Sequence, residues 1–270
     1  MPYIGGVLNM TGARPGQAFS FPGPAFPRQV CYIIKFTSTY EAIEKYILPP
    51  PLKVDRNLPP EVIVWYFSSP ESKGPDGSPA PYQGFQFRGN TEVDGVKGMA
   101  GWEYIDGLRG DKTEMDVMLS WAVHYGMAKK FADIRFTAVS GDEFEITVDR
   151  QATRLVTMRL RLGQEIDGDV LKGLAESADS PLAKDTFTVR EMPNSDFSGY
   201  SERTVCTAPT GRSCNVTQAW SADRGSIEFG HLESDPLSEL EPQEVTLTMV
   251  ANIQVQKETF TELKVVSVVE

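Results

Sequence analysis

Apolar residues along this chain recur mainly at every second position, which is the spacing of β-strands. The segment "EFEITVD" (143–149) alternates in this way, and so does "LVTMRLRL" (155–162). Such alternation is typical of strands with one buried face. Two continuous runs of β-branched and aromatic residues, "VCYIIKF" (30–36) and "EVIVWYF" (61–67), predict more fully buried strands. The remaining predicted strands cover 82–87, 98–106, 186–193, 244–256 and 259–269.

Two segments have the longer period of amphipathic helices. In "STYEAIEKYIL" (38–48), Ser38 and Glu41 form a capping-box pattern. Three prolines at 49–51 end this helix, because proline cannot continue the hydrogen-bond ladder. "KTEMDVMLSWAVHYG" (112–126) predicts a second helix that ends at a glycine. The apolar face of the first helix comprises Ala42, Ile43, Tyr46 and Ile47.

Together these segments predict an α+β chain that is predominantly antiparallel β, with two or three covering helices. A short third helix is expected within the polar stretch 163–185. The first 29 residues are rich in Gly, Pro and Phe and are expected to wrap as an N-terminal arm. No internal repeat or clear linker divides the chain, so residues 1–270 are predicted to form a single domain.

The composition argues against several functional classes. The formal net charge of −11 disfavours nucleic acid and anionic membrane surfaces as partners, because both require basic patches. No apolar stretch is long enough to cross a bilayer and no signal-peptide pattern is visible, so a cytoplasmic protein is expected. The two histidines and three cysteines lack metal-ligand spacing, so no metal site is indicated.

The stretch "MAKKFADIRF" (127–136) places Lys129 and Lys130 side by side among small and apolar residues. Such a pair usually lies on a solvated face of the protein. A lysine amine is a nucleophile only when it is unprotonated, and burial or a nearby cation favours that state. Neighbouring side chains of a strand point to opposite faces, so only one lysine can face a pocket. Alternation does not say which one, although the more polar face could be the inner one if a barrel has a reactive interior.

The segment "YGMAKKFADI" resembles the lysine motif of the acetoacetate decarboxylase family. Other segments resemble that family in the same order: "GPAFPR", "EAIEKYILPPPLKVD", "DGVKG" and "QAWSADRGSIEFGHLESDPLSELEPQEV". The resemblance implies a β-rich barrel or cone with peripheral helices, usually in homo-oligomers. It also implies a lysine that forms an imine (a Schiff base) with a ketone, as known for this family, without a metal or an organic cofactor.

The resemblance also assigns roles to particular residues. Lys129 matches the Schiff-base lysine, and Lys130 matches its neighbour. Arg28 aligns with an arginine that holds the substrate carboxylate, a task that suits a bidentate guanidinium; a surface arginine after a proline turn is the alternative. The remaining candidates for substrate binding are Glu61, Tyr82 and Gln86.

The sequence departs from the family pattern at three places. The family's other pocket glutamate falls on Gly84, its "GRE" before the lysine motif is "WAV" (121–123), and the proline before the lysine pair is Ala128. The imine-forming amine is therefore retained while its acid–base partners change. Gln83 or Gln86 could supply hydrogen bonds in place of the glutamate, but neither is a general acid or base.

Three functions remain open. The first is a lyase that decarboxylates a β-keto acid, because an iminium at Lys129 is a far better electron sink than a neutral ketone. The second uses the same imine for aldol addition, dehydration or cyclisation of a larger keto substrate in specialised metabolism. The third is a noncatalytic β-barrel that binds an apolar ligand. Under both enzyme hypotheses the partner is a small-molecule keto acid substrate.

Overall fold

The computed structural model describes residues 23–72, 79, 81–106, 122, 125–176, 184–196 and 198–269. Its strands are β1 (Phe26–Thr37), β2 (Glu61–Ser69), β3 (Tyr82–Val93), β4 (Val96–Asp106), β5 (Lys129–Ala138), β6 (Glu143–Arg150), β7 (Thr153–Glu165), β8 (Asp185–Pro193), β9 (Tyr200–Ala208), β10 (Cys214–Phe229), β11 (Val245–Val255) and β12 (Lys264–Val268). Its described helices are α2 (Tyr40–Tyr46), α4 (Gly168–Glu176), α5 (Thr210–Ser213), α6 (Glu258–Thr261) and the 3-10 helix η1 (Leu237–Leu240).

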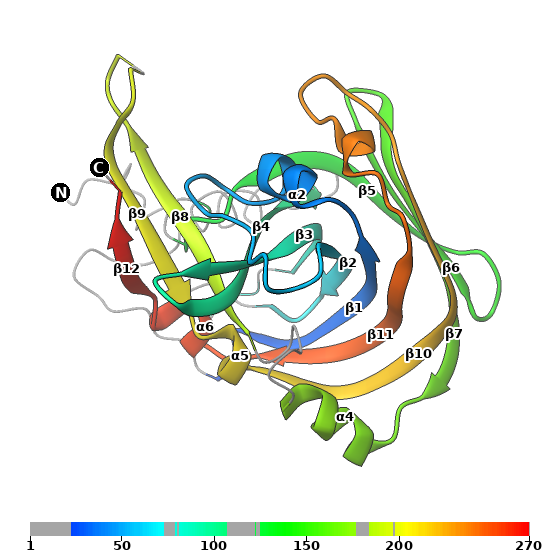
Figure 1. Cartoon of the computed structure of the whole chain (residues 1–270). Helices are drawn as coiled ribbons and strands as arrows, with labels where there is room; N and C mark the ends of the chain where they lie inside the picture. Colours follow the sequence, from blue (N-terminus) through cyan, green and yellow to red (C-terminus); the bar gives the residue numbers. More distant parts are fainter. Residues whose placement is uncertain are drawn as a thin grey trace.

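The described strands form one sheet in the order β12-β9-β8-β4-β3-β2-β1-β11-β10-β7-β6-β5. An additional pairing of β4 with β5 joins this order back on itself, so the strands from β4 to β5 form a closed ring (Figure 1). Within the ring, β4 and β5 are parallel and the other neighbours are antiparallel. The predicted fold class, mainly antiparallel β with peripheral helices, is confirmed.

Strand β4 is the point at which the ring and the outer strands meet. Near its start, Gly98 and Met99 pair with β8, and near its end Glu103–Asp106 pair with β5. Strands β8, β9 and β12 therefore leave the ring as an outer arm, seen on the left of Figure 1. The closing pair β4–β5 is short, and its register decides which side chains meet there.

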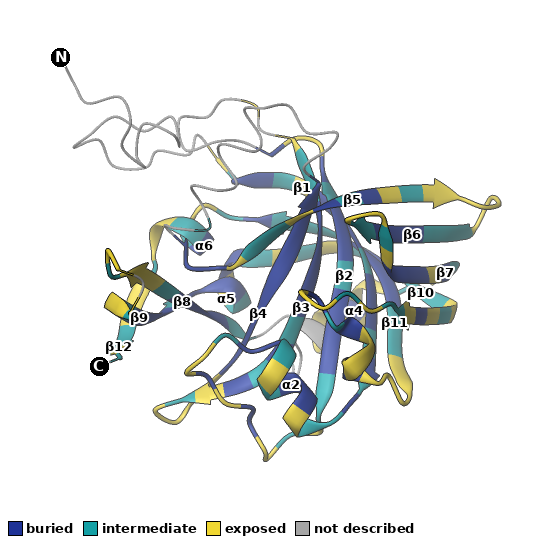
Figure 2. Cartoon of the chain, turned by 90° about the horizontal axis from the view of Figure 1, so that it is seen from above, coloured by how far each residue is buried: buried dark blue, intermediate teal, exposed yellow. Residues whose placement is uncertain are grey.

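Alternation along the ring strands separates two packed faces. The largest hydrophobic cluster joins residues from strands on opposite sides of the ring, such as Val64 and Met158, and so fills its interior. Helix α2 packs against this cluster through Ala42, Ile43 and Ile47. Two smaller clusters lie on the outer face of the ring strands. Figure 2 shows the buried residues concentrated along the strands, with exposed residues at the hairpin tips and on α4.

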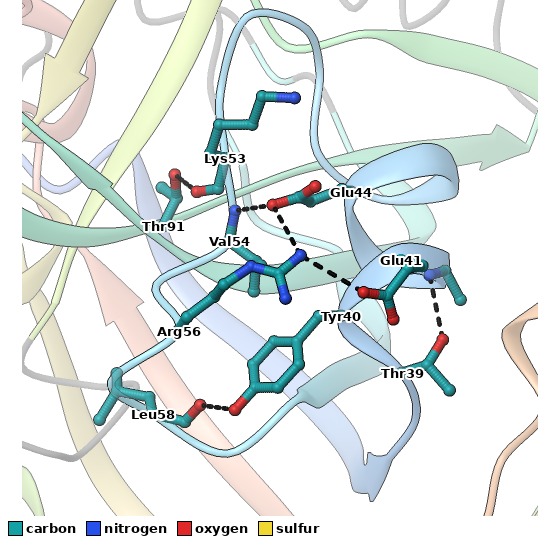
Figure 3. A network of polar contacts seen from close by, with 10 residues as sticks. Thr39, Tyr40, Glu41, Glu44, Lys53, Val54, Arg56, Leu58 and Thr91 are labelled. Carbon is teal, nitrogen blue, oxygen red and sulfur yellow. Dashed lines mark hydrogen bonds and ion pairs between the residues drawn. The ribbon is translucent and has the colours of Figure 1, made fainter.

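Helix α2 begins one residue later than its capping pattern predicts. Thr39 is the N-cap, and its side chain accepts a hydrogen bond from the Ala42 N–H at 3.1 Å (Figure 3). Ser38 was the predicted cap, but its hydroxyl instead donates to the carbonyl of Leu240. The helix is tied to the following loop through Arg56, which lies 3.4 Å from a carboxylate oxygen of Glu41.

Other predicted elements differ from the structure mainly at their ends. Strand β1 begins at Phe26 rather than at residue 30, and the predicted strand 259–269 divides into α6 and β12. Helix α4 (Gly168–Glu176) lies within the stretch 163–185 in which a short helix was expected. Most of the predicted helix 112–126 and most of the predicted N-terminal arm lie outside the described residues, although Ala122 and Tyr125 are described and helical. Among the residues that are described, no helix has both the length and the apolar character to span a membrane.

Candidate active site

A row of three side chains lies where the ring closes. In the parallel pairing of β4 with β5, Glu103 lies opposite Lys129, and in the antiparallel pairing of β3 with β4 it lies opposite Gln86. Side chains paired across neighbouring strands share a face of the sheet. Lys129 Nζ donates to Glu103 Oε1, and Gln86 Nε2 donates to Glu103 Oε2. The sheet register therefore holds an amine and a carboxylate in direct contact.

This contact is shielded from water. The side chain of Lys129 is 7% exposed and that of Glu103 is 1% exposed. Desolvation lowers the pKa of Lys129 to about 7, and the positive charge of Arg88 acts in the same direction. Contact with a carboxylate opposes this shift, because it favours the charged amine. A lysine with a pKa of about 7 is neutral in about half of the molecules at pH 7, whereas an ordinary lysine is almost always charged.

A cavity of about 150 Å³ opens beside the row, on the outer face of the ring. Much of its wall is apolar, and aromatic rings continue from one to the next along it. The ring centroids of Phe67 and Tyr82 are 5.0 Å apart, and those of Tyr82 and Phe26 are 5.4 Å apart. Within the described part of the chain, no cluster of three potential metal-ligating side chains is found. The cavity thus combines an apolar wall with a small polar end.

Lys130 lies on the opposite face of β5 from Lys129. Its Nζ is 2.6 Å from Asp235 Oδ1 and 5.0 Å from the centroid of the Trp102 ring. Its face continues into Ala132 and Ile134, which belong to the cluster inside the ring. The expectation that one lysine faces a pocket is met by Lys129. The suggestion that the more polar face is the inner one is wrong, because the apolar face of β5 packs into the interior.

The structure places two of the family-implied residues away from the cavity. Arg28 is 57% exposed and lies 3.6 Å from Glu71, itself exposed. Glu61 forms an ion pair with Lys35 at 3.0 Å and accepts a hydrogen bond from Thr246. Neither Arg28 nor Glu61 is among the residues that line the cavity. Both lie near the first residues of their strands, Arg28 in β1 and Glu61 in β2.

Tyr82 and Gln86 do line the cavity, as does the ring of Phe67. Gly84 lies between them on the same face of β3, where a Cβ atom would meet Phe67 Cζ at 2.5 Å. The phenyl ring therefore fills the space that a glutamate side chain at position 84 would need. Gln83 points elsewhere, and its Oε1 accepts a hydrogen bond from the Tyr66 hydroxyl at 2.7 Å.

Two charged residues of the site were missed from the sequence. Glu103 falls in the predicted strand 98–106 without an assigned role, and Arg88 directly follows the predicted strand 82–87. Positions 84, 86 and 88 are Gly, Gln and Arg, and they alternate with buried Phe85 and Phe87. That alternation is a signal for a polar face on β3, and it could have identified Arg88. No comparable local pattern identifies Glu103, because its role depends on the pairing with β5.

Comparison with known proteins places this geometry in a family. The family model for acetoacetate decarboxylase matches residues 10–264, which is nearly the whole chain. None of the curated proteins matches the sequence.

Several solved structures share the fold. The acetoacetate decarboxylase from Legionella pneumophila subsp. pneumophila superposes with a TM-score of 0.70 at 17% identity, covering 99% of this chain and 98% of that one. The enduracididine biosynthesis enzyme MppR, complexed with pyruvate, gives 0.66 at 13% identity, covering 94% and 95%. An acetoacetate decarboxylase-like enzyme from Sphingomonas wittichii RW1 gives 0.64 at 14% identity, covering 90% and 91%. At such identities these structures establish the fold, and with the match of the family model they show that the chain belongs to the acetoacetate decarboxylase family.

Proposed function

We propose that this protein is an imine-forming enzyme in which Lys129 condenses with the carbonyl carbon of a keto acid. The observation that carries the proposal is the amine of Lys129, which is buried at a cavity, contacts Glu103 and has a pKa lowered to about 7. Nucleophilic lysines need this combination of access to a ligand and an unprotonated fraction at neutral pH.

Glu103 is the group that moves protons in this proposal. It takes the proton of the Lys129 ammonium, so that the neutral amine attacks the carbonyl carbon and a carbinolamine forms. It then returns that proton to the carbinolamine hydroxyl, which leaves as water. The products are a protonated imine and an ionised Glu103, so the carboxylate ends beside the positive charge that the reaction creates.

The leading reaction from that imine is decarboxylation. The bond from the α-carbon to the carboxylate breaks, its electron pair moves into the protonated imine, and carbon dioxide leaves. The resulting enamine takes up one proton at carbon, and water hydrolyses the imine to release the ketone. No step in this sequence needs an electron sink other than the imine.

The test is reductive trapping on the full chain with a panel of small and large keto acids. Borohydride added during turnover converts an imine into a stable secondary amine, and peptide mass spectrometry locates it. We expect the adduct at Lys129, with carbon dioxide released from the β-keto acids of the panel. A panel that gives neither adduct nor turnover would favour a noncatalytic ligand-binding protein.

A second reaction is favoured by the position of Glu103. An ionised carboxylate beside the protonated imine stabilises that cation and so weakens its pull on the electrons of the breaking bond. The same carboxylate is placed to remove an α-proton, which yields an enamine that attacks an aldehyde. MppR, a relative by fold, has been captured with the condensation product of pyruvate and imidazole 4-carboxaldehyde.

Deuterium exchange separates the second reaction from the first. In heavy water, a keto acid that cannot lose carbon dioxide should exchange its α-protons if Glu103 removes them. The variant Glu103→Gln should be trapped by borohydride more slowly, because it lacks the group that moves protons during imine formation, and it should lose most of the exchange per imine formed. Exchange that is equal in the variant and the parent would leave decarboxylation as the better proposal.

A further inference from the structure

The charges around the cavity differ in sign from those of the whole chain. The net charge of the chain is −11, yet among the described lining residues Arg88, Lys129 and Lys184 are basic and Glu103 is the acidic one. A cavity with an excess of cations in an acidic protein favours an anionic ligand.

Arg88 is the cation whose surroundings point to a missing partner. Its Nη1 donates to the Thr186 hydroxyl, and its guanidinium carbon lies 5.1 Å from the centroid of the Trp65 ring. These contacts fix the plane of the guanidinium. Its Nε is buried and has no hydrogen-bond partner, and no carboxylate among the described residues forms an ion pair with it. A buried donor left unpaired is costly, and a guanidinium is completed best by a carboxylate that binds two N–H groups at once.

The position of Arg88 fits a ligand that also reaches Lys129. Arg88 follows Gln86 by two residues on the same face of β3, so their Cα atoms are roughly 7 Å apart along the strand. Gln86 is in register with Glu103, which is in register with Lys129. The side chains of Arg88 and Lys129 therefore approach the same end of the cavity. One ligand can react with the Lys129 amine and place a carboxylate at Arg88.

The aromatic part of the cavity wall is suited to an apolar ring. The aromatic chain of the wall extends from Phe67 through Tyr82 and Phe26 to Phe260, where the last two centroids are 5.2 Å apart. A volume of about 150 Å³ is that of an engineered apolar cavity that accepts benzene.

We infer that Arg88 binds the substrate carboxylate, and that the aromatic wall binds a ring-sized apolar substituent of the same molecule. The substrate class is therefore a keto acid with an aryl or comparably large apolar group. Binding of the carboxylate and of the ring does not require an imine to form. Only the position of the carbonyl group between the two sites rests on the proposed function of Lys129.

The first test uses ligands that cannot form an imine. Calorimetric titration of the full chain compares 3-phenylpropanoate with 3-phenylpropanamide, which lacks the charge, and with butanoate, which lacks the ring. We expect the phenyl acid to bind about 10- to 100-fold more tightly than the amide, because a charge-assisted hydrogen bond is lost. We expect it also to bind at least about tenfold more tightly than butanoate, because the ring buries apolar area. Equal affinities for the acid and the amide overturn the inference without any variant.

The second test assigns the carboxylate to a residue. Arg88→Gln should weaken the phenyl acid about 10- to 100-fold and leave the amide unchanged, and Arg88→Lys should fall between, because lysine keeps the charge without the planar fork. Arg159→Gln is the matched control, since Arg159 is half exposed and pairs with Glu145 on the surface. Arg28→Gln is the competing assignment. A loss of acid binding in Arg28→Gln, with none in Arg88→Gln, overturns the inference.

These outcomes remain distinct from those of borohydride trapping. Binding of the phenyl acid that depends on Arg88, together with no trapped adduct, would contradict the role of Lys129 and keep the carboxylate site. A trapped adduct with equal affinities for the acid and the amide would support the role of Lys129 and contradict the carboxylate site at Arg88.

Discussion

Lys129 and Lys130 are neighbours in sequence, yet the two faces of β5 give them different surroundings. Lys129 is 7% exposed and contacts Glu103, whose second oxygen accepts from Gln86. Lys130 is 38% exposed, and its partner Asp235 also accepts from the Tyr104 hydroxyl at 2.8 Å. One lysine therefore faces a cavity with few polar neighbours, and the other belongs to a dense polar network.

The two carboxylates also differ in how many cations they hold. Asp235 lies within 3.4 Å of Arg150 as well as near Lys130. Burial alone would raise the pKa of Asp235, but hydrogen bonds from Lys130, Tyr104 and Ser234 together lower it. Asp235, which is shared by two cations, holds neighbouring strands together. Glu103 contacts one amine beside the cavity and can exchange a proton with it. From this difference we predict that Lys129 acts in catalysis and that Lys130, on the other face of β5, contributes to the stability of the fold.

The largest expected effect comes from replacing each lysine by the same residue. Lys129→Gln should abolish the borohydride adduct and reduce turnover by at least about 1,000-fold, because the nucleophile is gone. Lys130→Gln should keep the adduct and lose less than about tenfold, because Lys130 does not line the cavity. The measurements are intact-protein mass after reduction and initial rates, with circular dichroism to verify folding. An adduct that persists in Lys129→Gln and disappears in Lys130→Gln would reverse the comparison.

The next effect is the pH dependence of imine formation. Because the pKa of Lys129 is lowered to about 7, the neutral amine should increase about tenfold per pH unit below that value and level off above it. The trapping rate with a saturating keto acid should follow this curve. Arg88→Gln removes one of the two causes of the shift, so the midpoint should move upward. A rate that continues to rise toward pH 10 would mean that the reacting amine is not desolvated.

The lowered pKa of Lys129 also affects how the stability of the fold depends on pH. The pKa of Lys129 in the folded chain lies below its unfolded value, so the unfolded chain binds more protons between about pH 7 and pH 10. The contribution of Lys129 to folding stability therefore becomes more favourable as the pH rises through that window. This is the opposite of what an ordinary lysine in an ion pair contributes.

The strand positions can be predicted from the sequence, but the candidate active site can be predicted only if the pairing of β4 with β5 is known. The predicted segments 61–67 and 143–149 correspond closely to β2 and β6, because alternation and β-branching are local properties. The contact of Lys129 with Glu103 joins residues 26 positions apart through a parallel pair that no local pattern specifies.

The family resemblance pointed to Lys129 for the imine and to Arg28 for the carboxylate. It could not reveal that Phe67 fills the space at Gly84, because that contact joins two strands through the volume of a ring. The resemblance places a family glutamate at position 84, where this chain has glycine, and the proposed mechanism assigns the acid–base role to Glu103 on the next strand.

The smallest expected effect concerns the face of β5 that carries Lys130. Asp235→Asn keeps the shape of the side chain and removes its charge, so Lys130 and Arg150 lose their shared partner. We expect a loss of about 1–3 kcal/mol in the free energy of unfolding at pH 7, measured by urea denaturation. Because the pKa of Asp235 is lowered in the folded chain, its stabilisation is present above the unfolded pKa and is lost as the pH falls through the folded value.

The difference between the variant and the parent should therefore shrink as the pH falls below the ordinary aspartate pKa of 3.8, where the unfolded chain takes up the proton first, and disappear as the pH falls through the lower folded pKa. Asp142→Asn, in an exposed turn, is the matched control and should change the free energy of unfolding by less than about 0.5 kcal/mol. A loss that stayed the same from pH 7 down to the acid limit would mean that Asp235 acts through packing rather than charge. In that case the contrast between the two lysines would rest on Lys129 alone, because the second carboxylate would no longer be a fixed ionic anchor for β5.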